Sequence, residues 1–193
     1  MRRTFLFVVL TLCLNFSSVA AFGQQNTTPP NASNAPTRET GDRGQQRLIK
    51  EVRHELLLLP FYGVFDNLAY RVDKDGTVTL LGQVSRPTLK SDAESAVKRI
   101  EGVEQVVNQI EVLPTSPNDD HIRRDTYRSI YGQEVLSQYA LRAVPPIHII
   151  VNNGHVTLEG AVANQMDKTI AGTQANSISG VFSVTNNLVV DVN

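Results

Sequence analysis

The sequence is poor in the residues that many binding and catalytic sites require. Cys13 is the single cysteine among 193 residues, and one thiol can form neither a disulfide framework nor a thiolate zinc site within the chain. Tryptophan is absent and aromatic residues make up 6% of the chain, so base-stacking platforms would be sparse. With 18 Lys and Arg against 19 Asp and Glu, no global positive charge exists to attract phosphate backbones, which argues against nucleic acid as a partner.

The first 23 residues have the pattern of a secretory signal peptide. Arg2 and Arg3 precede an apolar run over residues 5–14, and small residues follow over 17–21. The run is shorter than the roughly 20 residues of a membrane-spanning helix. We therefore expect an exported, periplasmic protein from which residues 1–23 are removed. A lipoprotein pattern would place a small residue directly before the cysteine, whereas Leu12 stands there, so we expect no lipid anchor. The export route stays open, because the two arginines also partly resemble a twin-arginine signal.

Residues 24–45 are mostly polar and contain little apolar surface to stabilise a fold, which predicts a disordered linker.

The rest of the chain contains an internal repeat at a constant separation of 78 residues, which aligns Gly76 with Gly154 and Gly102 with Gly180. Two copies of one domain explain this repeat. The predicted domains cover residues 46–113 and 123–193, joined by a Pro-containing linker over 114–122.

Each repeat divides into predicted helices and strands. Residues 46–59 and 87–100 carry apolar side chains at helical spacing, whereas 68–72, 77–84 and 106–112 alternate as strands do. The order α-β-β-α-β predicts an α+β fold of two tandem small two-layer domains, each a three-stranded mixed sheet with two helices on one face. The third strand should run parallel to the second, since a helix connects them. The strand order stays open.

The first strand of the second repeat has an unusual pattern. In the ungapped alignment, Ile147, Ile149 and Val151 fall on the face that carries Ala69, Arg71 and Asp73 in the first repeat. We therefore expect the outer face of this strand to be covered. His148 takes the place of Tyr70 in that alignment. We therefore expect an inward-facing, half-buried and hydrogen-bonded histidine.

Glycines and asparagines recur at matching positions of the two repeats, and we expect them to be structural. The asparagines fall among inward-facing apolar residues, so their amides need buried partners. We expect backbone groups at the turn after the second helix to supply them, with a ligand contact as the alternative. The set is Gly76, Gly82, Gly102 and Asn108, with Gly154, Gly160, Gly180 and Asn186.

The segments over residues 75–84 (Asp-Gly-Thr-Val-Thr-Leu-Leu-Gly-Gln-Val) and 101–108 (Glu-Gly-Val-Glu-Gln-Val-Val-Asn) recur in the second repeat at 153–162 and 179–186. This pattern resembles the BON domain family of bacterial envelope proteins. A tandem pair behind a signal is similar to the osmotically inducible periplasmic members. The resemblance implies a non-enzymatic role in envelope integrity or stress tolerance, with phospholipid surfaces or unfolded envelope proteins as partners.

No residue pattern in the chain indicates catalysis or metal binding. The histidines form no His-x-x-x-His pair, the glycines lack the Gly-Lys-Ser/Thr of a phosphate loop, and no nucleophile elbow occurs. The run Asp119-Asp120-His121 lies in the predicted linker, where we expect a solvated loop. We therefore expect no enzyme, no metal and no cofactor, and a binding module for phospholipid or envelope surfaces, with a holdase-type chaperone as the alternative. The oligomeric state stays open.

The connection after the first helix is unusually apolar and is our candidate contact surface. It contains Phe61, Tyr62, Val64 and Phe65, where a short polar loop would be ordinary. In one interpretation Phe61 and Phe65 pack under the helices of their own domain while Gly63 permits the bend. In the other, part of the loop stays exposed as an apolar wedge for lipid or a partner.

Overall fold

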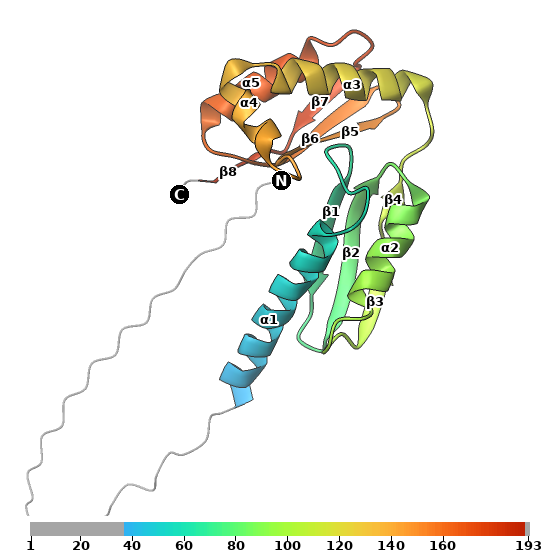
Figure 1. The fold of residues 1–193 in the computed structure, drawn as a ribbon, viewed down its shortest axis with the longest axis vertical. Helices are drawn as coiled ribbons and strands as arrows, with labels where there is room; N and C mark the ends of the chain where they lie inside the picture. The colour runs from blue at the N-terminus through green and yellow to red at the C-terminus, as the bar shows by residue number, and fades with distance from the viewer. Residues whose placement is uncertain (1–36, 192–193) are drawn as a thin grey trace, which may run out of the picture. The chain divides into compact units, whose positions relative to one another are not determined.

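Two copies of an α-β-β-α-β unit follow each other along the chain (Figure 1). The computed structural model describes residues 37–191, so the predicted signal peptide and residues 24–36 of the predicted linker lie outside the described residues. The first copy consists of α1 (Thr37–Leu57), β1 (Asn67–Val72), β2 (Thr77–Val84), α2 (Pro87–Val97), β3 (Gln105–Asn108) and β4 (Glu111–Val112). The second consists of α3 (Pro117–Tyr131), α4 (Glu134–Ser137), the 3-10 helix η1 (Gln138–Leu141), β5 (Ile147–Asn152), β6 (His155–Val162), α5 (Gln165–Asn176), β7 (Ser183–Asn186) and β8 (Val189–Val190).

Both sheets have the predicted mixed topology. In the first, the order is β1-β2-β3 with β4 also pairing with β2, and the second sheet repeats it as β5-β6-β7 with β8 on β6. The hairpin strands are antiparallel, whereas β3 and β4 run parallel to β2 because a crossover helix returns the chain. The predicted third strand is thus present as two short strands.

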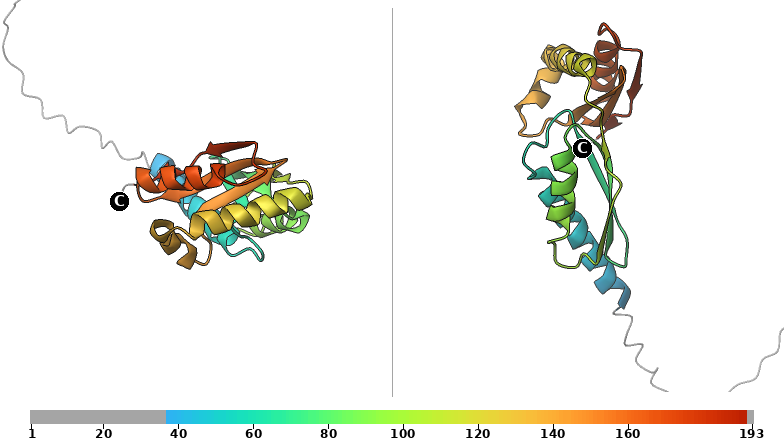
Figure 2. Two further views of the ribbon diagram at one scale, coloured as in Figure 1. Left: turned by 90° about the horizontal axis from the view of Figure 1, so that it is seen from above. Right: turned by 90° about the vertical axis from the view of Figure 1, so that its right-hand side faces the viewer.

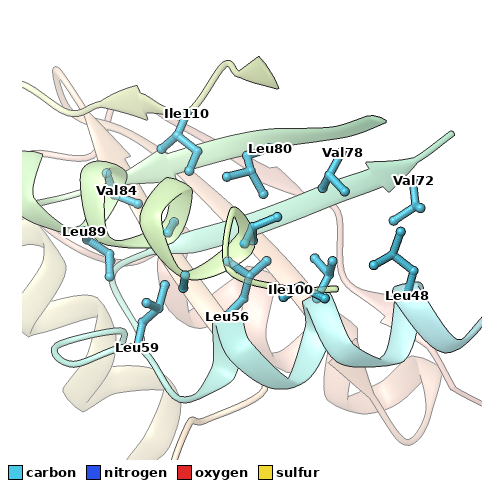
Figure 3. Close-up of a cluster of buried hydrophobic side chains, with 14 residues drawn as sticks. Leu48, Leu56, Leu59, Val72, Val78, Leu80, Val84, Leu89, Ile100 and Ile110 are labelled. Carbon is cyan, nitrogen blue, oxygen red and sulfur yellow. The ribbon is translucent and has the colours of Figure 1, made fainter. Parts of the chain in front are cut away.

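Helices α1 and α2 lie together on one face of the first sheet (Figure 2). Leu48, Val52 and Leu56 repeat every four residues on α1, so they form one stripe that faces the sheet. Figure 3 shows Leu48 and Leu56 of this stripe opposite the inward side chains of β2, which are Val78, Leu80 and Val84 and are all fully buried. The two-layer α+β architecture predicted from the sequence is therefore confirmed.

Two predicted linkers are shorter in the structure. Residues 37–45 are helical and not disordered, because α1 begins at Thr37. The Gln45 side-chain amide donates to the Val72 carbonyl at 2.7 Å, and extending an anchored helix costs little once it is nucleated. Likewise α3 begins at Pro117, so the linker predicted over 114–122 ends at Ser116, whose side chain caps the helix by accepting from the Asp119 N–H.

The alignment at a constant separation of 78 fails in the first strand of the second repeat. Val72 lies opposite Val78 in the first hairpin, but Val151 lies opposite Val156 in the second. The second hairpin loop is therefore one residue shorter, and a one-residue shift turns every strand side chain to the other face. Ile147, Ile149 and Val151 consequently face the second core, and His148 points to the opposite face, contrary to our prediction.

Between residues 37 and 191, no helix combines the length and the hydropathy that a membrane-spanning segment needs.

Candidate functional site

The segment over residues 60–66 lies between α1 and β1 and bends at Phe61. Phe61 has a φ of 68°, a left-handed conformation that bulky residues rarely adopt. Gly63, which we expected to permit the bend, has no positive φ. The strain is thus placed on an aromatic residue, and the side chains that follow it are turned toward the second repeat.

The far half of this segment packs against the second repeat. The Ile149 N–H on β5 donates to the Val64 carbonyl at 2.7 Å. The Phe65 ring lies edge-on to Tyr127 of α3 at 6.2 Å between ring centres, and Val64 and Phe65 pack on the second core. The prediction that Phe65 packs under the helices of its own domain is therefore wrong.

Tyr62 and His148 form the central contact between the repeats. Tyr62 packs on the first core, and its ring stacks on His148 with 5.6 Å between ring centres. His148 is 9% exposed and its Nδ1 has no hydrogen-bond partner among the described residues. Burial lowers the pKa of His148 below its usual value, although the carbonyls of Gly63 and Asp66 act in the opposite direction.

Asp66, which we did not single out from the sequence, holds the end of the segment. Its buried carboxylate accepts hydrogen bonds from the Ser85 N–H at 2.7 Å, the Ser85 hydroxyl at 2.8 Å and the Gly63 N–H at 3.3 Å. Asp66 directly precedes β1 and Ser85 directly follows its antiparallel partner β2. Their proximity was therefore available from the predicted hairpin.

Of the four candidate contact residues, only Phe61 is exposed. Its side chain is 71% accessible, and the Arg86 guanidinium lies 5.0 Å above the ring centre. Leu57 and Leu58 at the end of α1 are also exposed. We call Leu57, Leu58 and Phe61 the apolar rim. The structure thus divides the predicted contact loop into an exposed rim and a half-buried junction between the repeats.

A groove of about 730 Å³ lies beside this junction. Its apolar lining includes Leu56, Leu57 and Leu68 from the first repeat and residues 143–146 from the second. His148 also lines it, and Arg53 and Arg142 supply guanidinium groups. Its volume is within the range of about 300–1,000 Å³ that is typical of small-molecule sites.

The recurring glycines meet steric and conformational requirements of the backbone. A Cβ at Gly82 would lie 2.0 Å from the Asn67 carbonyl oxygen, and one at Gly160 would lie 1.9 Å from that of Pro146. Only glycine fits where the two strands of each hairpin approach so closely. The remaining members of the set, Gly76, Gly102, Gly154 and Gly180, also have positive φ.

The two asparagines connect helix to strand in each repeat. The Asn108 amide donates to the Lys90 carbonyl of α2 at 3.0 Å, and its Oδ1 accepts from the Ile110 N–H. Asn186 donates to the Lys168 carbonyl of α5 at 2.8 Å in the same way. The predicted backbone partners are present, but they belong to the helix itself and to the strand break, not to the turn after the helix.

Asp119 is a buried structural carboxylate, contrary to the solvated loop that we expected for residues 119–121. It is 1% exposed and accepts from the Asn153 and Gly154 N–H groups, both at 2.9 Å. It therefore ties the first turn of α3 to the hairpin turn between β5 and β6. No cluster of three or more potential metal-binding side chains occurs within residues 37–191.

Comparison with known proteins agrees with this arrangement of two repeats. The BON domain family matches residues 61–114 and residues 132–191. This chain belongs to the BON domain family. The two matches cover all the strands of each sheet and the helix that connects them, whereas α1 and α3 lie outside the matches.

One curated relative is the outer membrane lipoprotein DolP of Haemophilus influenzae, which is 30% identical over 113 residues. The match covers 58% of this chain, and the chain spans 58% of the length of DolP. Among solved structures, two of CdsD, a structural protein of the type III secretion system of Chlamydia trachomatis, are 15% identical with a TM-score of 0.28. The first match covers 76% of this chain and 93% of the CdsD chain, and the second covers 75% and 97%. At this TM-score the two structures have no bearing on the function of this chain.

Proposed function

We propose that this BON protein is a non-enzymatic protein of the bacterial envelope that binds anionic phospholipid surfaces through the apolar rim. The observation that carries the proposal is the exposed Phe61 ring with the Arg86 guanidinium 5.0 Å above it. The similarity to an outer membrane lipoprotein supports the envelope location, where such a role would contribute to envelope integrity or stress tolerance.

The composition of the rim suits the boundary between lipid headgroups and acyl chains. Leu58 and Phe61 are 64% and 71% exposed, and apolar side chains grouped in this way are stabilised when they enter the acyl region. Arg86 places a positive charge beside them, which attracts an anionic headgroup. Because the net charge of the chain is −1, this attraction is local and should weaken with salt.

The limited exposure of the predicted contact loop favours lipid over unfolded proteins as the partner of this loop. A holdase needs a broad apolar surface, but Tyr62, Val64 and Phe65 are packed against the two cores. The part of this loop and of the adjoining helix end that stays exposed, the apolar rim, is narrow and has the Arg86 cation at its edge, which suits a headgroup more than an unfolded chain.

Vesicle flotation tests the proposal. We expect the protein to float with phosphatidylglycerol vesicles at low salt and not with phosphatidylcholine vesicles. Phe61→Asn should abolish most of the flotation without loss of stability, because asparagine tolerates a positive φ. Phe182→Asn is the matched control, since Phe182 is 77% exposed in the second repeat and lies outside the rim. Equal losses in the two variants, or no flotation of the unsubstituted protein, would refute membrane binding through the rim.

A further inference from the structure

We infer that the groove between the repeats binds one molecule of an anionic amphiphile, a single acyl chain with a carboxylate or phosphate head. This assignment rests on the proposed function for the source of the ligand, since Leu57 belongs both to the apolar rim and to the groove lining. The assignment adds to the proposed function a site for one monomeric ligand, lined mainly by residues that do not belong to the apolar rim.

The lining of the groove is divided between apolar and cationic groups. Leu56 and Leu68 supply aliphatic surface from the first repeat, and Val144 supplies it from the second. Contact with these side chains would remove an acyl chain from water, and burial of each CH₂ group contributes roughly 0.8 kcal/mol to binding.

The charged groups of the lining favour an anion. Arg53 and Arg142 are exposed, and neither forms an ion pair within the described residues. Asp191 is the one carboxylate of the lining. Among the lining residues, two guanidinium groups stand against one carboxylate, and guanidinium suits both carboxylate and phosphate. Asp66 and Glu159 also face His148, but the Asp66 carboxylate already accepts hydrogen bonds from Ser85 and Gly63.

His148 adds a polar ring to the lining of the groove. Its side chain is buried, and Nδ1 has no hydrogen-bond partner among the described residues. His148 lines the groove, with the carbonyls of Gly63 and Asp66 beside its ring, and its imidazole is one of the polar side chains in the lining.

Fluorescence quenching provides a direct test, because the chain contains no tryptophan. Ala143→Trp places one reporter at an exposed position of the groove lining, and Phe182→Trp places a control outside it. We expect 12-bromododecanoate, below its micellar concentration, to quench the Ala143→Trp emission saturably and to leave the Phe182→Trp emission nearly unchanged. Equal quenching of the two reporters would overturn the assignment.

Calorimetric titration of the unsubstituted protein tests the charge requirement. Dodecanoate should bind, and its methyl ester should not. Arg53→Gln and Arg142→Gln should each weaken dodecanoate binding about two- to fivefold, as expected for exposed ion pairs, whereas the matched surface variant Arg99→Gln should not. Titration with dodecanoyl lysophosphatidylglycerol compares a phosphate head with the carboxylate of dodecanoate. The ligand that binds more tightly identifies whether the site takes a lysophospholipid or a fatty acid. Binding of the ester equal to that of the acid would overturn the proposal.

The two proposals fail in different ways. Flotation of the protein on vesicles without binding of monomeric dodecanoate would refute the groove site and leave membrane binding through Phe61 intact. Binding of dodecanoate by a protein that does not float would refute the proposed function and retain the groove site.

Discussion

The backbone N–H of Ile149 donates to the carbonyl oxygen of Val64 across 2.7 Å. This hydrogen bond joins β5, the edge strand of the second sheet, to the segment that lies between α1 and β1 in the first repeat. Edge strands present unpaired backbone groups that invite unwanted pairing. At this position the first repeat covers the edge of the second. The apolar loop of the first repeat thus has a structural role, and only its exposed end is available for binding.

Phe65→Ala tests this junction. The variant loses the contact with Tyr127 and the packing on the second core, so we expect the free energy of unfolding to fall by about 1–2 kcal/mol, or roughly 2–8 °C in Tm. Phe61→Ala is the control at an exposed ring of the same segment and should change Tm little. Thermal unfolding followed by circular dichroism measures both, and equal Tm values would contradict the buried role of Phe65.

Gly160→Ala tests the close approach of strands in the second hairpin. The added Cβ would lie 1.9 Å from the Pro146 carbonyl oxygen at a φ of 112°, so strands β5 and β6 must separate, and we expect a loss of more than about 2 kcal/mol. The matched control is Gly44→Ala, because that helical glycine has nothing within 4 Å of the added Cβ. It should stabilise α1 by about 0.5–1 kcal/mol. Chemical denaturation distinguishes the two, and a neutral Gly160→Ala would refute the steric argument.

The buried His148 should make stability depend on pH. Burial lowers the pKa of His148 in the folded protein below the ordinary value of 6.5. At a pH between the folded-state pKa and 6.5, His148 therefore binds a proton in the unfolded chain but not in the folded chain. The stabilisation is therefore complete above pH 6.5 and is lost as pH falls through the folded-state pKa. Asp66 and Glu159 face His148 and oppose the shift, but burial is the largest cause.

We accordingly expect Tm to fall between pH 7.5 and pH 5.5, and to fall less in His148→Phe, which keeps an aromatic ring against Tyr62 but does not titrate. Differential scanning calorimetry of the two proteins at both pH values measures the effect. Parallel decreases in both proteins would assign the pH dependence to other groups.

Local sequence patterns were sufficient to determine the architecture of each repeat. The apolar stripe on α1, the alternation in β2 and the Asp-Gly and Asn-Gly turns depend on spacing along the chain, which sets the periods of helix and strand. The recurring glycines were also identifiable, because a positive φ is a property of the local backbone. The BON family match covers the strands and turns of both repeats.

The sequence did not determine which face His148 occupies or what the 60–66 segment contacts. The first depends on a hairpin loop one residue shorter in the second repeat, which an ungapped alignment conceals. The second depends on Val64 and Phe65 reaching residues of another repeat far along the chain. The burial of Asp119 likewise came from a distant turn that donates two N–H groups. These contacts became visible in the tertiary structure alone. The residues that bury or hydrogen-bond Val64, Phe65 and Asp119 are distant in the sequence, and a local pattern carries information about sequence neighbours only.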